Sequence, residues 1–222
     1  MALWVFGDSF SVTYPYLDNQ EYHLWHELLT TNLDLVGQHN YAQWGVSNEY
    51  IIDQVLTYRL QFKPGDHIII QLTSSARQWF FKDHPELANF YVSDIDSFLT
   101  KDQCTALQMY VTYLQRTDID DLRYTLFTAA LQLLVQVFNE CKILILPGFD
   151  KIPGITGTLM DICNGEFISA ESRNTWYCNN NIDPRFNYFG KENHELLATQ
   201  IMQYFQTGKI INLHEGYKKG FL

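Results

Sequence analysis

Short, continuous apolar runs recur along the chain and predict buried β-strands. The clearest are Ala2–Phe6, His67–Leu72 and Lys142–Leu146, each bordered by turn residues such as glycine, proline or aspartate. A further strand is expected between residues 33 and 42, either at Leu33–Val36 or at His39–Ala42. Apolar runs without alternating polar positions are typical of strands that are covered on both faces.

Apolar residues at helical spacing separate these runs. They predict helices over residues 22–29, over residues 48–60 with Ser47 as the N-cap, near residues 101–114 and 119–141, and over residues 192–204. Strands that alternate with helices form a parallel sheet with right-handed crossovers. The pattern therefore predicts an α/β fold, a three-layer α/β/α sandwich around a short parallel sheet.

The whole chain, residues 1–222, is expected to form one domain, because its length suits a single α/β unit. Residues 76–141 exceed what a minimal connection between strands needs, and we interpret them as an enlarged helical and loop insertion.

Composition and charge exclude several classes of function. The formal net charge is −10 and the basic residues form no long run, which argues against nucleic-acid binding. No stretch reaches the roughly 18 apolar residues of a membrane span, and the N-terminus shows no signal peptide. The four cysteines show no metal-ligand spacing, so we expect free thiols and no metal site. These features predict cytoplasmic synthesis and leave open packaging into a virus particle.

Three segments follow predicted strands or lead into the next helix: residues 7–11, 43–48 and 73–77. Parallel α/β sheets bind ligands at the carboxyl ends of their strands. Ser9 stands two residues after the glycine that ends the first strand, where its hydroxyl can cross the sheet edge and a nearby amide can face an oxyanion. The tripeptide Gly-Asp-Ser alone is weak evidence, because turns are rich in these residues. Arg77 is expected at a pocket rim, binding a carboxylate or phosphate, or else as a solvated loop arginine.

The block GDSFS at residues 7–11 and the segment NYAQWGVSNEYIIDQVL at residues 40–56 resemble the first two blocks of the SGNH/GDSL hydrolase family. The resemblance implies a flavodoxin-like sandwich of the SGNH hydrolase type, with Ser9 as the nucleophile and the Gly45 amide in the oxyanion hole. It also implies a serine esterase that needs no cofactor and acts on an acylated glycan or another small ester.

The third family block, Gly-x-Asn-Asp, is absent from this sequence. Its place is taken by a Leu-Thr-Ser-Ser stretch at residues 72–75, so the side-chain donor to the oxyanion is missing. The hydroxyl of Thr73 or Ser74, or the amide of Asn48, is expected to replace it, since hydroxyls and amides both donate hydrogen bonds.

The last family block carries the general base, as Asp-x-x-His before the final helix. Asp183 matches the aspartate, but Phe186 then occupies the position of the base. If the family block is instead aligned backward from the final helix, His194 matches a second histidine of the family, which starts that helix. Tyr188 then falls at the position of the base. A tyrosine with an ordinary pKa near ~10 is a poor base at neutral pH.

Three alternatives for the base remain open. His194 takes the role with Asp183 orienting it, or the site has lost its base, or another histidine reaches the serine (His39, His84 or His214). If a general base reaches Ser9, the sequence predicts a hydrolase. If the general base is lost, the sequence predicts a catalytically silent structural or adhesion protein with protein partners. The blocks GDSFS, GVSN and TSSAR are also similar to SGNH-type proteins of tailed bacteriophages, which implies a virion component.

Three further histidines receive ordinary interpretations. His23 and His26 are three residues apart but lack a matching carboxylate pattern, so we place them at the surface or core edge and not at a metal. His67 opens a predicted strand and is expected to be a hydrogen-bonded edge residue.

Overall fold

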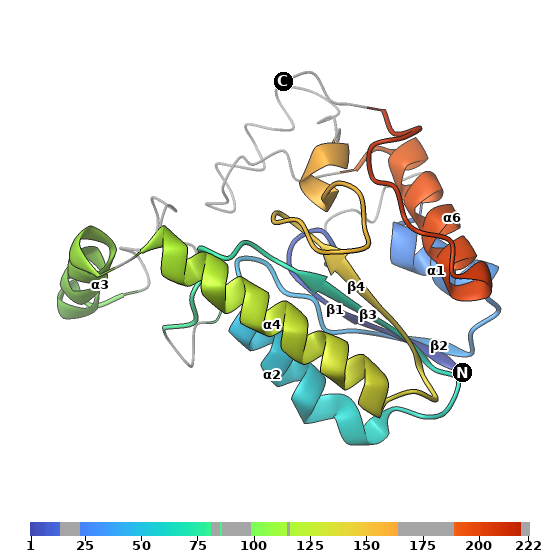
Figure 1. Ribbon diagram of the computed structural model, residues 1–222, viewed down its shortest axis with the longest axis horizontal. Helices are drawn as coiled ribbons and strands as arrows, with labels where there is room; N and C mark the ends of the chain where they lie inside the picture. Colours follow the sequence, from blue (N-terminus) through green and yellow to red (C-terminus); the bar gives the residue numbers. More distant parts are fainter. Residues whose placement is uncertain (14–22, 81–84, 86–98, 115, 164–188, 219–222) are drawn as a thin grey trace.

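The computed structural model of the chain describes residues 1–13, 23–80, 85, 99–114, 116–163 and 189–218. Four parallel strands form a sheet in the order β2-β1-β3-β4 (Figure 1), namely β1 (Ala2–Phe6), β2 (Gly37–Asn40), β3 (His67–Leu72) and β4 (Lys142–Pro147). The α-helices are α1 (Trp25–Asn32), α2 (Asn48–Tyr58), α3 (Lys101–Tyr113), α4 (Thr117–Val137) and α6 (Lys191–Thr207), and the 3-10 helices are η2 (Arg59–Gln61) and η5 (Leu159–Ile162).

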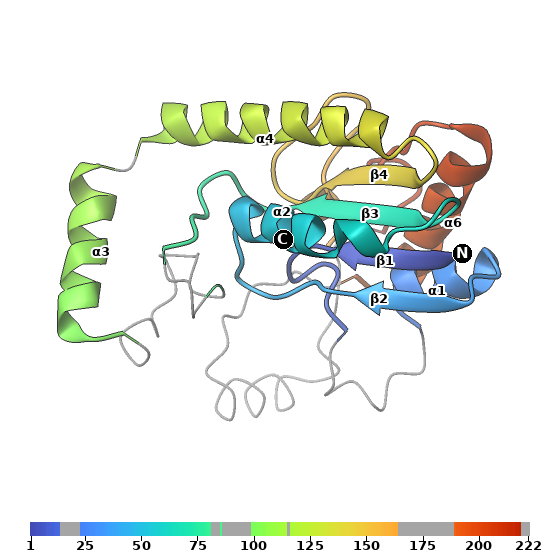
Figure 2. The ribbon, with the colours of Figure 1, turned by 90° about the horizontal axis from the view of Figure 1, so that it is seen from below.

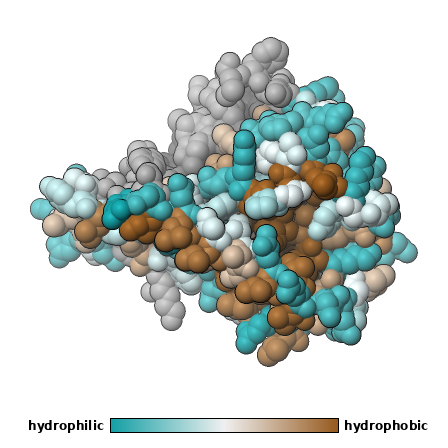
Figure 3. Space-filling model, viewed as in Figure 1, coloured by the Kyte–Doolittle hydropathy of each residue, from teal (hydrophilic) through white to brown (hydrophobic). Residues whose placement is uncertain are grey.

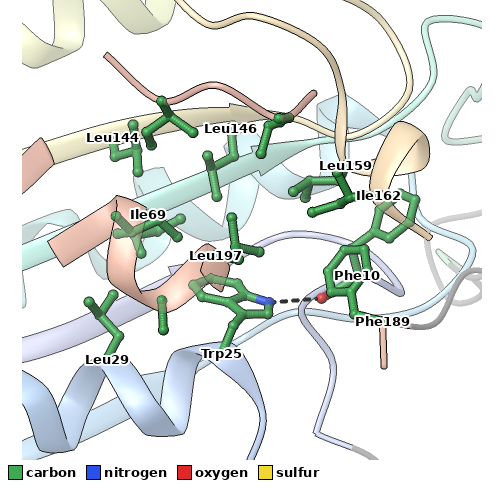
Figure 4. Packing of buried hydrophobic residues seen from close by; sticks show 14 of the residues in the cluster. Phe10, Trp25, Leu29, Ile69, Leu144, Leu146, Leu159, Ile162, Phe189 and Leu197 are labelled. Atoms are coloured by element: carbon green, nitrogen blue, oxygen red, sulfur yellow. Dashed lines mark hydrogen bonds between the residues drawn. The ribbon is translucent and has the colours of Figure 1, made fainter. Parts of the chain in front are cut away.

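Successive residues of a strand face opposite sides of the sheet, and they build two apolar clusters. Leu3 of β1 lies in the cluster formed with α1 and α6, whereas its neighbour Trp4 lies in the cluster formed with α2 and α4. Figure 4 shows the first cluster, in which the Trp25 indole Nε1 donates to the carbonyl oxygen of Phe10 at 3.0 Å. Helices therefore lie on both faces of a parallel sheet (Figures 1 and 2), which confirms the α/β class and is compatible with three layers.

The second strand differs from both expected sets of bounds. β2 occupies Gly37–Asn40, which confirms the expected strand between residues 33 and 42; the bounds Leu33–Val36 are wrong, and His39–Ala42 overlaps the strand only at His39 and Asn40. The strand is held by backbone pairing with β1, from Ala2 opposite Gly37 to Val5 opposite Asn40, and not by an apolar run.

The two helices of the predicted insertion are placed differently relative to the sheet. α4 buries Tyr124 and Leu131 in the cluster that contains Ile143 of β4, so this helix completes one layer of the sandwich. α3, in contrast, stands clear of the sheet (Figure 2). Within the described segments, no helix is long and apolar enough to cross a membrane.

Candidate functional site

A buried ion pair joins the ends of β1 and β3. Arg77 Nη1 donates to Asp8 Oδ2 at 2.9 Å, and Thr73 Oγ1 donates to the same oxygen at 2.5 Å. The other carboxylate oxygen of Asp8 accepts from the Phe10 amide at 3.1 Å. Asp8 is fully buried and Arg77 is only 5% exposed. Because buried charges require partners, this network fixes the two loops against each other.

The burial of Arg77 corrects the expectation of a rim or solvated arginine. Its guanidinium lies over the ring of Phe149, with 5.0 Å between Cζ and the ring centroid, as well as against Asp8. The buried carboxylate attracts the cation inward, because a charge inside the protein needs a partner of opposite sign. Arg77 therefore supports the turn that follows β1.

The side chain of Gln71 in β3 contacts the same turn as the ion pair. Its Oε1 accepts from the Asp8 amide at 2.8 Å and from Ser11 Oγ at 3.2 Å, and its Nε2 donates to the Leu72 carbonyl oxygen at 2.7 Å. A Cβ on Gly7 would stand 2.5 Å from Gln71 Oε1, so the Gln71 side chain can hold this position because residue 7 has no side chain. The sequence does carry a signal for this network, since Gln71 is the one polar side chain inside the buried run IIIQL and its amide must find partners.

Ser9 lies in the turn that these contacts hold. The Ser11 amide donates to the Asp8 carbonyl oxygen at 3.0 Å and closes the turn at the carboxyl end of β1, where Ser9 is partly buried. The Gln43 amide donates to the Gly7 carbonyl oxygen at 3.0 Å. The segments 7–11, 43–48 and 73–77 therefore meet at one edge of the sheet.

Thr73 and Asn48, expected to replace the missing oxyanion donor, are bonded within the protein. Asn48 Oδ1 accepts from the Thr73 amide at 2.8 Å, and Asn48 Nδ2 donates to the Thr73 carbonyl oxygen at 3.2 Å. The Thr73 hydroxyl has a single proton and donates it to Asp8, so in this arrangement it is not available to a substrate oxygen. Asn48 fixes the position of Thr73. Gly45, at the start of the same loop, has a φ of 69°, a conformation that favours glycine.

His194 lies in the first turn of α6 and packs against α1. Its Nδ1 accepts from the Trp25 amide at 3.1 Å, and its ring meets Phe189 edge-on at 5.3 Å between centroids. A neutral imidazole whose Nδ1 accepts carries its proton on Nε2, so Nε2 is a donor. Burial, together with the nearby His26, lowers the pKa of His194 from 6.5 to about 3. In this arrangement Nε2 carries a proton and does not accept one, and the role of His194 as general base to Ser9 stays a prediction.

His26 is a second buried histidine, which corrects its expected place at the surface or core edge. It is 1% exposed, its Nδ1 lies 2.6 Å from Gln38 Nε2, and its Nε2 lies 3.4 Å from Asn40 Nδ2. Asn40 in turn donates to the Ser11 carbonyl oxygen at 2.7 Å, which links the histidine to the GDSFS turn. Burial lowers the pKa of His26 to about 4. No cluster of three or more potential metal ligands occurs among the described residues.

The other candidate bases fall elsewhere. His39 stacks on Trp4 with 4.1 Å between ring centroids, over the sheet face that α2 and α4 cover. His214 lies beside Gly157, close to the bridge between Thr156 and Asn212. Asp183, Tyr188 and His84 lie outside the described residues.

Comparisons of the chain with protein-family models, with curated proteins and with solved structures found no match. The fold and the site define an α/β protein in which polar residues join three loops at the carboxyl edge of a parallel sheet. The resemblance to SGNH/GDSL hydrolases that the sequence blocks at residues 7–11 and 40–56 suggest stays a prediction.

Proposed function

We propose that this chain is a catalytically silent domain of the SGNH-hydrolase type with a structural or adhesive role, such as that of a virion component. The observation that carries the proposal is the hydrogen bond from the Trp25 amide to His194 Nδ1. It leaves a proton on the imidazole nitrogen that would have to accept one from Ser9.

The low basicity of His194 supports the same conclusion. A general base is most effective when its pKa lies near the working pH, and burial lowers the pKa of this imidazole to about 3. Releasing His194 would also break its bond to Trp25 and leave a buried amide without its acceptor. A serine without a base retains only weak activity from its oxyanion hole.

The polar side chains at the sheet edge are used to hold loops together. Asp8, Thr73 and Arg77 bond to one another, and Gln71 and Asn48 bond to the backbone of these loops. An edge whose polar side chains bond within the protein suits a scaffold with protein partners.

A serine esterase acting on an acylated glycan or another small ester is the second candidate. The meeting of three loops around the turn of Ser9 favours it. In this function Ser9 attacks the acyl carbon, the amides of Ser9 and Gly45 hold the oxyanion, and Asp183 orients His194 after its ring has turned. This chemistry requires no cofactor or metal.

Labelling of the purified protein with a fluorophosphonate probe tests the two functions. We expect the folded wild type to label no more than Ser9→Ala, with folding verified by circular dichroism and a known serine hydrolase as positive control. Labelling of the wild type that is lost in Ser9→Ala would overturn the proposal and establish an activated serine. A parallel loss in His194→Gln would then identify His194 as the base.

A further inference from the structure

Large apolar side chains lie exposed along the outward face of α4. They recur at helical spacing over the length of the helix, and Figure 3 shows the apolar surface that they form on the viewed face. Their exposed fractions are 43, 57, 61, 63 and 75% for Ile119, Leu122, Leu126, Leu133 and Val137. We call these five residues, with the exposed Ala129 and Ala130 between them, the α4 stripe.

The opposite side of α4 is also apolar, and no charged residue occurs from Tyr124 to Asn139. The sheet covers the side that carries Tyr124 and Leu131. Apolar side chains therefore lie on two sides of α4, and a contiguous exposed apolar surface of this kind normally marks an interaction surface.

We propose that the α4 stripe is the interface of a homodimer in which the α4 helices of two copies pack antiparallel about a two-fold axis. A two-fold interface must be complementary to itself. A two-fold axis through the helical turn between Leu126 and Ala130 places Leu126 of each copy against the small Ala130 of the partner subunit. The same axis sets Ile119 opposite the partner's Val137, so β-branched residues close both ends of the contact.

The surface presented by the stripe is close to the smallest that a dimer requires. A leucine-sized side chain at these exposed fractions presents on the order of 100 Å² of apolar surface, so the five side chains present on the order of 500 Å² per copy. Two copies then bury on the order of 1,000 Å², which is about the lower limit for a biological interface.

Charge favours the antiparallel arrangement and a protein occupant. Antiparallel copies oppose their helix dipoles, and they keep Asp118, which pairs with Arg116 of its own chain, away from Asp118 of the other copy. Parallel copies would set Asp118 against its own equivalent. A net charge of −10 and the lack of basic residues along the stripe oppose docking on an anionic membrane.

Sedimentation velocity over a range of protein concentrations tests the interface. We expect wild type to reach twice its monomer mass of 26.0 kDa, whereas Leu126→Glu and Leu126→Lys raise the dissociation constant by about a hundredfold or more. Leu60→Glu is the matched control, because Leu60 is 87% exposed on η2 and lies outside the stripe. A wild type that stays monomeric, or a dimer that persists in both Leu126 variants, would overturn the proposal. Thermal melting verifies that the variants fold.

Cross-linking with a short bismaleimide tests the orientation, with the native cysteines of wild type as background. Ala130→Cys lies near the two-fold axis and should cross-link to itself. Ile119→Cys alone should not, but it should cross-link when mixed with Val137→Cys. Self-cross-linking of Ile119→Cys would indicate a parallel pair and would contradict the antiparallel interface.

Discussion

The ion pair between Asp8 and Arg77 gives the sharpest test of how the sheet edge is built. Replacing Arg77 with methionine keeps a long side chain beside Phe149 but removes the cation from a fully buried carboxylate. Asp8 keeps the Thr73 hydroxyl and the Phe10 amide, both neutral donors. Removing one partner of a buried pair costs about 3–5 kcal/mol, which is a large part of the roughly 5–15 kcal/mol by which a domain is stable.

Urea unfolding of wild type, Arg77→Met, Asp8→Asn and the double variant measures this cost and the coupling between the two residues. We expect the double variant to lose clearly less than the sum of the single losses, because neutralising the carboxylate together with the guanidinium leaves no buried charge without a partner. A loss below about 1 kcal/mol in Arg77→Met, or strictly additive losses, would refute the inference that the pair is buried and coupled.

Three further outcomes follow from the structure. His26 and His194 stay neutral in the folded protein, because burial lowers the pKa of each below 6.5, to about 4 and about 3. The free energy of unfolding should therefore fall as the pH drops from 6.5 toward 4, by up to about 3 kcal/mol for His26, when it is measured by urea unfolding. The variant His214→Gln, in which an exposed histidine is replaced, is the control and should show the same dependence of stability on pH as wild type. Gly148→Ala should lower the free energy of unfolding by about 1–3 kcal/mol, since its Cβ would meet the Leu72 carbonyl oxygen. Gly37→Ala, where a Cβ meets nothing within 4 Å, should lower it little in the same urea unfolding experiments. Equal losses in the two variants would contradict the close approach of Gly148 to Leu72. Gln71→Leu should cost about 1–3 kcal/mol by leaving the Asp8 amide and the Ser11 hydroxyl unpaired, and an unchanged unfolding midpoint would show that these bonds contribute nothing.

The strands that the sequence predicted correctly are those that apolar side chains stabilise. β1 and β3 are buried on both faces, so their apolar runs mark their bounds directly. β2 has the sequence GQHN and is only partly buried, and the backbone of β1 selects it. The side-chain pattern located this strand only to within residues 33–42, because GQHN contains no apolar run that would mark its bounds.

The same distinction applies to the site. The rule that ligands bind at the carboxyl ends of strands located the three loops, since it depends only on strand order and direction. The partners of each polar side chain depend on contacts across the fold, such as Arg77 with Asp8, 69 residues away, and His194 with Trp25, 169 residues away. Residue type alone could not reveal that the arginine is buried or that the imidazole holds its proton on Nε2.

These contacts also determine which substitutions can report on catalysis. Loss of probe labelling in a variant of Asp8, Thr73 or Arg77 would follow from collapse of the loops as readily as from loss of chemistry, because each residue holds another in place. Ser9→Ala removes a single oxygen from the turn, whose backbone bonds and Asp8 contacts stay available. His194→Gln keeps an acceptor near the Trp25 amide but no imidazole. An activity that survives His194→Gln but not Ser9→Ala would require a base other than His194, which separates the remaining mechanisms more cleanly than any change in the ion pair.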